Sequence, residues 1–204
     1  MMATTHALAG MALLSVTGLI APEHLPVAVS AAAVGGIAPD LDLYSDHRRT
    51  LHYPVAYSVT AALFLAVAIV LPTAVTVALA AAFISAALHS VMDVFGGGLE
   101  LKPWQKTSDR AVYSHYHGRW IRPRRWIRYD GAPEDVALAG ALAVPLLIVF
   151  TGRIRRVVLL ILAVSIVYGL VRKPLVLAAE WLVRALPAEV VELLPARFTE
   201  DLRP

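Results

Sequence analysis

The stretch GGIAPDLDLYSDHRRTLHYP, residues 35–54, places three aspartates and two histidines in a chain that is otherwise strongly apolar. His89 and Asp93 repeat the same combination further along, four residues apart, so in a helix both side chains lie on one face. The chain has no cysteine. Imidazole and carboxylate groups are the ligands that such a protein can offer to a divalent metal. These segments therefore predict a metal site.

The composition predicts the scaffold that carries this site. Of the 204 residues, 58% are hydrophobic and only 16% are charged, and the mean hydropathy is +0.67. These values indicate an all-α, polytopic membrane protein rather than a soluble domain. Hydropathy predicts about six hydrophobic spans, of which the second and sixth are short: 6–21, 26–38, 54–71, 73–95, 135–151 and 156–171.

The spans divide the chain into four parts. Residues 1–95 are expected to form a four-span helical core that carries the metal site, and residues 96–134 a long basic cytoplasmic loop that leaves the core through three flexible glycines. Residues 135–173 add two further spans. Residues 174–204 alternate apolar turns with charges and contain prolines, a pattern typical of amphipathic helices on the membrane surface.

Counting six spans puts every unusual polar residue on one side of the membrane. That side also receives 15 of the 18 lysines and arginines, and the other side only Arg153, Arg155 and Arg156. The positive-inside rule then makes the polar side cytoplasmic, in the cell membrane. Seven candidate metal ligands gather there: His6, Asp40, Asp42, His47, His52, His89 and Asp93.

These residue types favour metal-dependent hydrolysis. Seven candidates suffice for one or two zinc ions, with manganese as an alternative, and such ions activate water for attack on a phosphoester. Arg48 or Arg49 can neutralise the charge that develops on phosphate. His115 and His117 are candidates for acid-base groups brought in by the loop, or else they are surface residues of that loop.

The ordered motifs resemble the YdjM-like family of membrane-bound, metal-dependent hydrolases. They are TH-x3-G at Thr5, His6 and Gly10, PDLD at 39–42, HRR-x2-H from His47 to His52, and H-x3-D at His89 and Asp93. The resemblance covers roughly residues 1–105. It implies a multi-span hydrolase, distantly similar to zinc-dependent phospholipase C and P1-type nucleases, with metal ligands His6, Asp40, Asp42, His52, His89 and Asp93. Tyr53 departs from the serine frequent in the family.

Two other functions remain open. A divalent-cation transporter also uses carboxylates and histidines inside the membrane, and it predicts ligands near mid-membrane or access from both sides. A non-enzymatic scaffold would bind anionic lipid through the loop sequence RWIRPRRWIRY, residues 119–129, which mixes cations with aromatic rings. Single-stranded nucleic acid is a less favoured partner for this stretch because it adjoins membrane spans.

Overall fold

The structure is a computed structural model, and it describes residues 1–187, 190–191 and 193. The fold is mostly helical, as predicted. Its α-helices are α1 (Ala3–Leu14), α2 (Thr17–Ile20), α3 (Leu25–Ile37), α4 (Pro54–Val70), α5 (Ala74–Met92), α6 (Pro133–Val149) and α7 (Gly152–Ala185). Short 3-10 helices connect them: η1 (Pro22–His24), η2 (Ala38–Tyr44), η3 (Asp93–Phe95) and η4 (Pro103–Gln105). The loop before α6 contains one antiparallel hairpin, β1 (Val112–Ser114) and β2 (Arg119–Ile121).

Four helical segments are long and apolar enough to cross a membrane. They run over Ala3–Ile20, Pro22–Leu43, Ala74–Phe95 and Gly152–Ala185, whereas α4 and α6 each have 17 residues. Large apolar side chains on their outer faces are exposed, such as Leu19, Ile148 and Leu170. An apolar outer surface of this extent is consistent with membrane association.

Helix α7 is longer than the sequence predicts. Hydropathy places the end of the last span near 171, but α7 continues through Arg172, Lys173 and Pro174 to Ala185. Pro174 lacks the amide that a helix interior requires, yet ion pairs hold the helix on both sides of it: Arg172 with Asp130, and Glu180 with Lys102. The predicted surface tail therefore begins as helix, and its residues 188–189, 192 and 194–204 lie outside the described residues.

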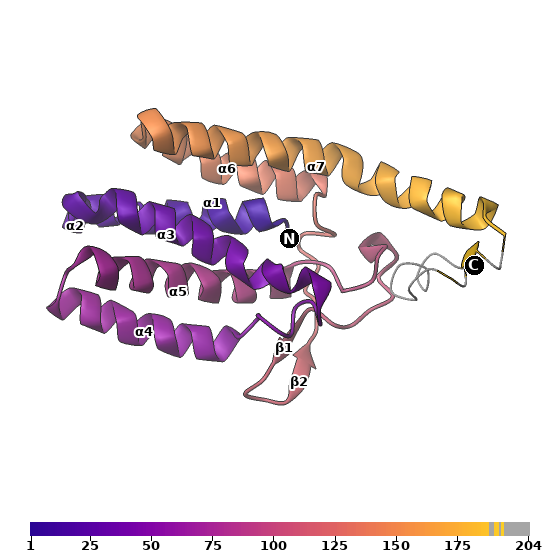
Figure 1. Ribbon diagram of the computed structural model, residues 1–204, viewed down its shortest axis with the longest axis horizontal. Helices are drawn as coiled ribbons and strands as arrows, with labels where there is room; N and C mark the ends of the chain where they lie inside the picture. Colours follow the sequence, from indigo (N-terminus) through magenta and orange to yellow (C-terminus); the bar gives the residue numbers. More distant parts are fainter. Residues whose placement is uncertain (188–189, 192, 194–204) are drawn as a thin grey trace.

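Glycines allow the central helices to approach closely. In Figure 1, α4, α5, α3 and α1 lie alongside one another, and α6 and α7 cover the α1 side. A Cβ atom on Gly35 would lie 2.1 Å from the Ala82 carbonyl oxygen of α5, and one on Gly36 would lie 2.8 Å from Ala7 Cα of α1. Small residues are what helices in lipid use to pack backbone against backbone. Here they bring the ends of α1, α3 and α5 together.

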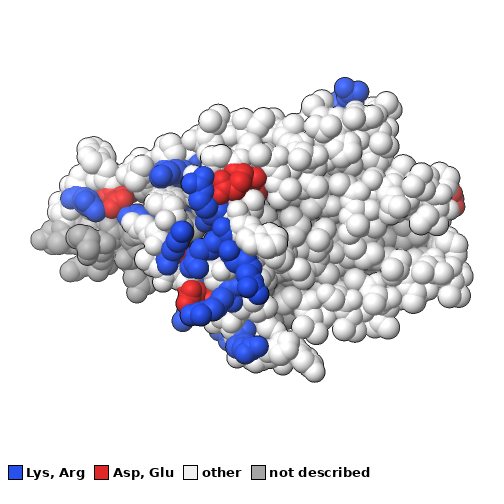
Figure 2. All heavy atoms as spheres, turned by 180° about the vertical axis from the view of Figure 1, so that it is seen from behind, with Lys and Arg blue, Asp and Glu red and all other residues white. Residues whose placement is uncertain are grey.

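The polar connections gather at one end of this bundle. The start of α1, the end of α3, the start of α4, the end of α5 and the start of α6 all meet there, close to the label N in Figure 1. Lysines and arginines form a band across the molecule next to a large uncharged body (Figure 2). Such a band is typical of the boundary between lipid and water.

Candidate metal centre

Four side chains from separate elements converge at this end. Asp40 comes from η2, which follows α3 where Pro39 has no amide hydrogen to continue the α-helical bonding. His52 precedes α4, whose first residue is Pro54. His89 lies in the last turn of α5, and Asp93 follows it by one turn at the start of η3. One ligand atom from each of the four lies within 4.8 Å of all the others.

The distances between these atoms are short and similar. His52 Nε2 lies 3.1 Å from His89 Nε2. Asp93 Oδ2 lies 3.3 Å from the His52 nitrogen and 3.4 Å from the His89 nitrogen. Asp40 Oδ1 lies 3.4 Å from His89 Nε2 and 3.7 Å from His52 Nε2. A tetrahedral zinc ion with bonds of ~2.0–2.1 Å separates its ligands by roughly 3.3 Å, and these five separations fit such an ion.

Hydrogen bonds fix which nitrogen of each imidazole faces the centre. His89 Nδ1 lies 2.7 Å from the Gly36 carbonyl oxygen, which only accepts, so Nδ1 carries a proton and donates. His52 Nδ1 donates to Asp42 Oδ2 at 3.0 Å. In the neutral imidazoles both Nε2 atoms therefore carry lone pairs, which face each other at 3.1 Å. Two lone pairs this close repel unless a proton or a metal ion lies between them, and metal-ligating histidines adopt the second arrangement.

Burial strengthens the case for a cation. His52 and His89 are fully buried and Asp93 is 1% exposed, whereas the Asp40 side chain is 20% exposed. Asp93 Oδ2 has no hydrogen-bond donor among the described residues. A buried carboxylate oxygen without a donor is costly, and a metal ion would satisfy it. The donor set and its geometry thus fit a divalent metal.

Asp42 supports the centre from behind. Its Oδ2 accepts hydrogen bonds from His52 Nδ1 and from the Leu51 amide at 3.1 Å, and its Oδ1 lies 2.8 Å from His47 Nδ1. An extended PDLD segment would point Asp40 and Asp42 the same way, but η2 is helical and turns them apart. The structure therefore places Asp42 and His47 behind the group of four rather than in it. Such outer partners orient ligands and raise their basicity.

Three further groups surround the Asp93 carboxylate. Its Oδ1 accepts from the Met1 amino group at 2.8 Å and from His6 Nε2 at 3.0 Å, and the His6 ring stacks on His89 at 3.8 Å. Arg48 Nε lies 3.4 Å from Asp93 Oδ2. His6 is therefore next to the four-residue group, where it holds one of the ligands.

Arg48 is the buried arginine of the predicted pair. It is 6% exposed, donates through a terminal nitrogen to the Gly97 carbonyl at 2.9 Å, and has a left-handed backbone with φ 58°. Left-handed backbone in a non-glycine residue is uncommon and clusters at functional sites. The three glycines expected to be a flexible exit, residues 96–98, are buried, and a Cβ on Gly97 would lie 2.6 Å from the Arg128 carbonyl oxygen.

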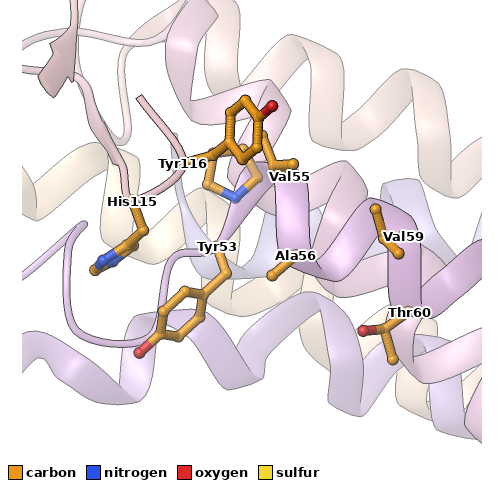
Figure 3. Close-up of a pocket in the computed structure, with 8 residues that line it drawn as sticks. Tyr53, Val55, Ala56, Val59, Thr60, His115 and Tyr116 are labelled. Atoms are coloured by element: carbon orange, nitrogen blue, oxygen red, sulfur yellow. The ribbon is translucent and has the colours of Figure 1, made fainter. Parts of the chain in front are cut away.

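The remaining candidates lie on the surface, away from the four ligand atoms. Arg49 is exposed and contacts Asp46 and the Tyr113 ring. His117 pairs with the Ser114 hydroxyl. His115 donates to the Arg49 carbonyl and stacks on Tyr53, and with Tyr116 and the side of α4 it lines a separate groove of about 390 Å³ (Figure 3).

The environment of His52 favours a positive charge at the centre. Burial opposes protonation of this imidazole, but its hydrogen bond to Asp42 and the negative charge of Asp93, 3.3 Å away, outweigh burial and raise the pKa of His52. A site that stabilises imidazolium in the absence of metal is electrostatically prepared for a cation.

Asp40 connects the centre to a cavity. This cavity of about 570 Å³ lies between η2 and α7, and the polar side chains along it include Asp40, His47, Arg48, Glu100 and Arg172. Arg172 also donates to Asp130 at 2.8 Å, and the hydroxyl of Tyr168 donates to the same carboxylate. These bonds tie α7 to the loop before α6. Three of the four side chains are thus buried, and the fourth, Asp40, is partly exposed where it lines the cavity.

Comparisons with known proteins supply no identity. No family model, curated protein or solved structure matches the chain. Two parts of that site, the Gly36 carbonyl behind His89 and Arg172 in the cavity, were not among the predicted residues. A backbone carbonyl leaves no signal in the residue types, and Arg172 is one of the 15 lysines and arginines whose positions predict only the orientation of the chain.

Proposed function

We propose that the protein is a membrane-bound, metal-dependent hydrolase of a phosphoester, with a lipid or lipid-linked substrate. The observation that carries the proposal is the convergence of His52 Nε2, His89 Nε2, Asp93 Oδ2 and Asp40 Oδ1, with Asp40 at the edge of a cavity. With His52, His89 and Asp93 as ligands, a position beside the partly exposed Asp40 would remain for water, which is the pattern of catalytic zinc sites.

Zinc is the metal we favour, since two imidazoles and two carboxylates at these separations suit a tetrahedral ion. When bound, the ion would polarise a phosphoryl oxygen and lower the pKa of a water molecule. Asp40 can serve as fourth ligand or accept a proton from that water at the cavity edge. Arg48 offers a guanidinium for phosphate oxygens next to Asp93.

The proposed topology has six spans with the site on the cytoplasmic face of the cell membrane. In it, α4 and α6 cross as shorter helices beside the four longer segments. The asymmetry of lysine and arginine supports this orientation. The motifs that contain His6, Asp40, His52, His89 and Asp93 support membership in the YdjM-like hydrolase family.

The transporter hypothesis fits the geometry less well. It requires ligands near mid-membrane or access from both sides, whereas the four ligands come from helix ends that meet at one end of the bundle. The scaffold hypothesis does not explain why two fully buried histidines, His52 and His89, lie with their ring nitrogens next to the carboxylates of Asp40 and Asp93. Lipid binding by the basic loop is compatible with hydrolysis and needs no separate protein function.

Hydrolysis by purified protein tests the proposal. Zinc-loaded protein in detergent should cleave a soluble chromogenic phosphodiester or monoester, and chelation should stop the reaction. His89→Ala should abolish turnover, while Asp46→Asn, which changes an exposed carboxylate in the connection between η2 and α4, should not change it. A zinc-loaded, folded wild-type protein that cleaves neither soluble esters nor phospholipids would overturn the proposal.

A further inference from the structure

The cavity beside Asp40 has walls of two kinds. Asp40, Arg48 and Arg172 supply polar groups, whereas Leu41 and Leu43 of η2 and Val164 of α7 supply apolar surface, as does Ile37 at the end of α3. Its volume of about 570 Å³ lies within the ~300–1,000 Å³ of small-molecule sites. A cavity with a charged part and an apolar part fits an amphiphile.

The apolar walls continue onto the outside of the molecule. Leu41 is 69% exposed, Leu43 is 63% exposed and Val164 is 48% exposed, although all three line the cavity. Leu41 and Leu43 belong to the segment Pro22–Leu43, and Val164 to Gly152–Ala185, both long and apolar enough to cross a membrane. Exposed apolar side chains on such segments face lipid. The cavity therefore opens sideways toward the bilayer, between η2 and α7.

The charges in the cavity favour a phosphate at its inner end. Arg48 lines the cavity, while its Nη1 donates to the Gly97 carbonyl and its Nε lies 3.4 Å from Asp93 Oδ2. Arg172 faces the cavity while it is held by Asp130. A metal ion on the four ligands would add positive charge to the same end. Paired arginine and metal contacts are how proteins bind phosphate oxygens.

Glu100 sets a further requirement on the ligand. It lines the cavity, and neither of its carboxylate oxygens has a donor among the described residues. A second negative charge on the ligand would be repelled here, whereas a hydroxyl or amine would donate to these oxygens. A lipid phosphodiester with donors in its headgroup satisfies both Arg48 and Glu100.

We infer that the opening between η2 and α7 is a lateral entrance through which a phospholipid, carrying a single phosphodiester and a headgroup with hydroxyl or amine donors, reaches the metal centre from the membrane. That the lipid is hydrolysed at this centre rests on the proposed function, whereas its binding through the entrance does not. The headgroup phosphate lies near Arg48, and the acyl chains leave past Leu41 and Val164 into the bilayer.

Photo-crosslinking in nanodiscs tests binding without requiring turnover. Zinc-loaded protein is labelled by phosphatidylglycerol with a diazirine near the glycerol end of an acyl chain, and labelled peptides are located by mass spectrometry. Labels should concentrate on residues 37–43 and 161–172. Leu41→Trp and Val164→Trp, both at exposed positions, should reduce this labelling about tenfold, equivalent to ~1.4 kcal/mol. Val167→Trp is the control, because Val167 is exposed on α7 but does not line the cavity.

A parallel hydrolysis assay tests the lipid entrance and the proposed hydrolase activity separately. Leu41→Trp and Val164→Trp should lose phosphatidylglycerol hydrolysis and keep hydrolysis of a soluble phosphodiester. Labelling spread evenly over the outer helices, or labelling of residues 37–43 and 161–172 that neither tryptophan variant reduces, would overturn the inference of a lateral entrance. This holds even if the protein cleaves a soluble ester. Concentrated, tryptophan-sensitive labelling without cleavage of any ester would support the entrance as a lipid site and overturn the hydrolase.

Discussion

His52 and His89 present their Nε2 atoms to each other at 3.1 Å, and each is held in that orientation from behind, His52 by Asp42 and His89 by the Gly36 carbonyl. This relationship links the packing of the helices to the chemistry of the site. Because both outer nitrogens donate, both inner nitrogens are free to bind a cation.

The first prediction concerns Asp42. Asp42→Asn removes the charge that orients His52 while it keeps the size of the side chain. Loss of such an outer partner typically weakens metal affinity ~10–100-fold. Competition with a chromogenic zinc chelator measures this change. Asp46→Asn, which alters an exposed carboxylate four residues away, should leave affinity unchanged, and equal affinities of the two variants would contradict the role given to Asp42.

The second prediction separates two neighbouring arginines. Arg48→Met removes a buried guanidinium next to Asp93, so turnover of a phosphoester should fall by ~10²–10³, the usual cost of one transition-state donor. Zinc should still bind, because none of the four ligand atoms changes. Arg49→Met is the matched control, since Arg49 is exposed and pairs with Asp46. Steady-state kinetics, with equal zinc content in both variants, compares their turnover. Equal rates in Arg48→Met and Arg49→Met would show that Arg48 does not stabilise the transition state.

The third prediction concerns helix packing. Gly36→Ala places a Cβ 2.8 Å from the His6 carbonyl oxygen and Ala7 Cα, so overpacking should cost about 1–3 kcal/mol of unfolding free energy. The same change should disturb the carbonyl that holds His89. Gly140→Ala in α6 meets open space and should preserve or slightly raise stability. Thermal unfolding in detergent compares them, and a stable Gly36→Ala would contradict the close contact of α1 and α3.

The fourth prediction is a dependence of stability on pH. Burial opposes ionisation of Asp130, but the hydrogen bond and charge of Arg172 and the hydrogen bond from Tyr168 outweigh it, so the pKa of Asp130 lies below its usual ~3.9. The carboxylate therefore stabilises the fold above about pH 4. This contribution is lost as pH falls through the lowered pKa.

Asp130→Asn isolates that contribution. At pH 7 the variant should unfold with about 1.5–3 kcal/mol less free energy than wild type, in the range of hydrogen bonds to charged groups. The difference should shrink as pH falls below about 4. Asp109→Asn, which removes an exposed ion pair with Arg122, should matter little at any pH. A deficit in Asp130→Asn that does not change with pH would show that the ion pair is not its source.

Hydropathy predicts the helical scaffold well because apolar runs of this length have few alternatives to helix. It does not predict where α7 ends, since ion pairs of Arg172 and Glu180 with distant residues stabilise the helix beyond its apolar part. Nor does it predict β1 and β2, which are three residues each within a polar loop.

Residue types alone predict the ligands of the site only as a larger set. Asp40, His52, His89 and Asp93 all belong to the seven candidates. Sorting Asp40 from Asp42 depends on the helical turn of η2, which the sequence PDLD does not specify. The contact between His6 and Asp93 depends on how closely α1 approaches the end of α5, a matter of tertiary packing.

Metal content tests the central claim most directly. Protein purified in detergent and supplied with zinc, then freed of excess metal, should retain about one zinc per chain by elemental mass spectrometry. His52→Ala and Asp93→Ala, shown to be folded by gel filtration and circular dichroism, should retain little, while Asp109→Asn should match wild type. A folded wild-type protein that retains neither zinc nor manganese, or His52→Ala and Asp93→Ala variants that retain as much as wild type, would contradict the account.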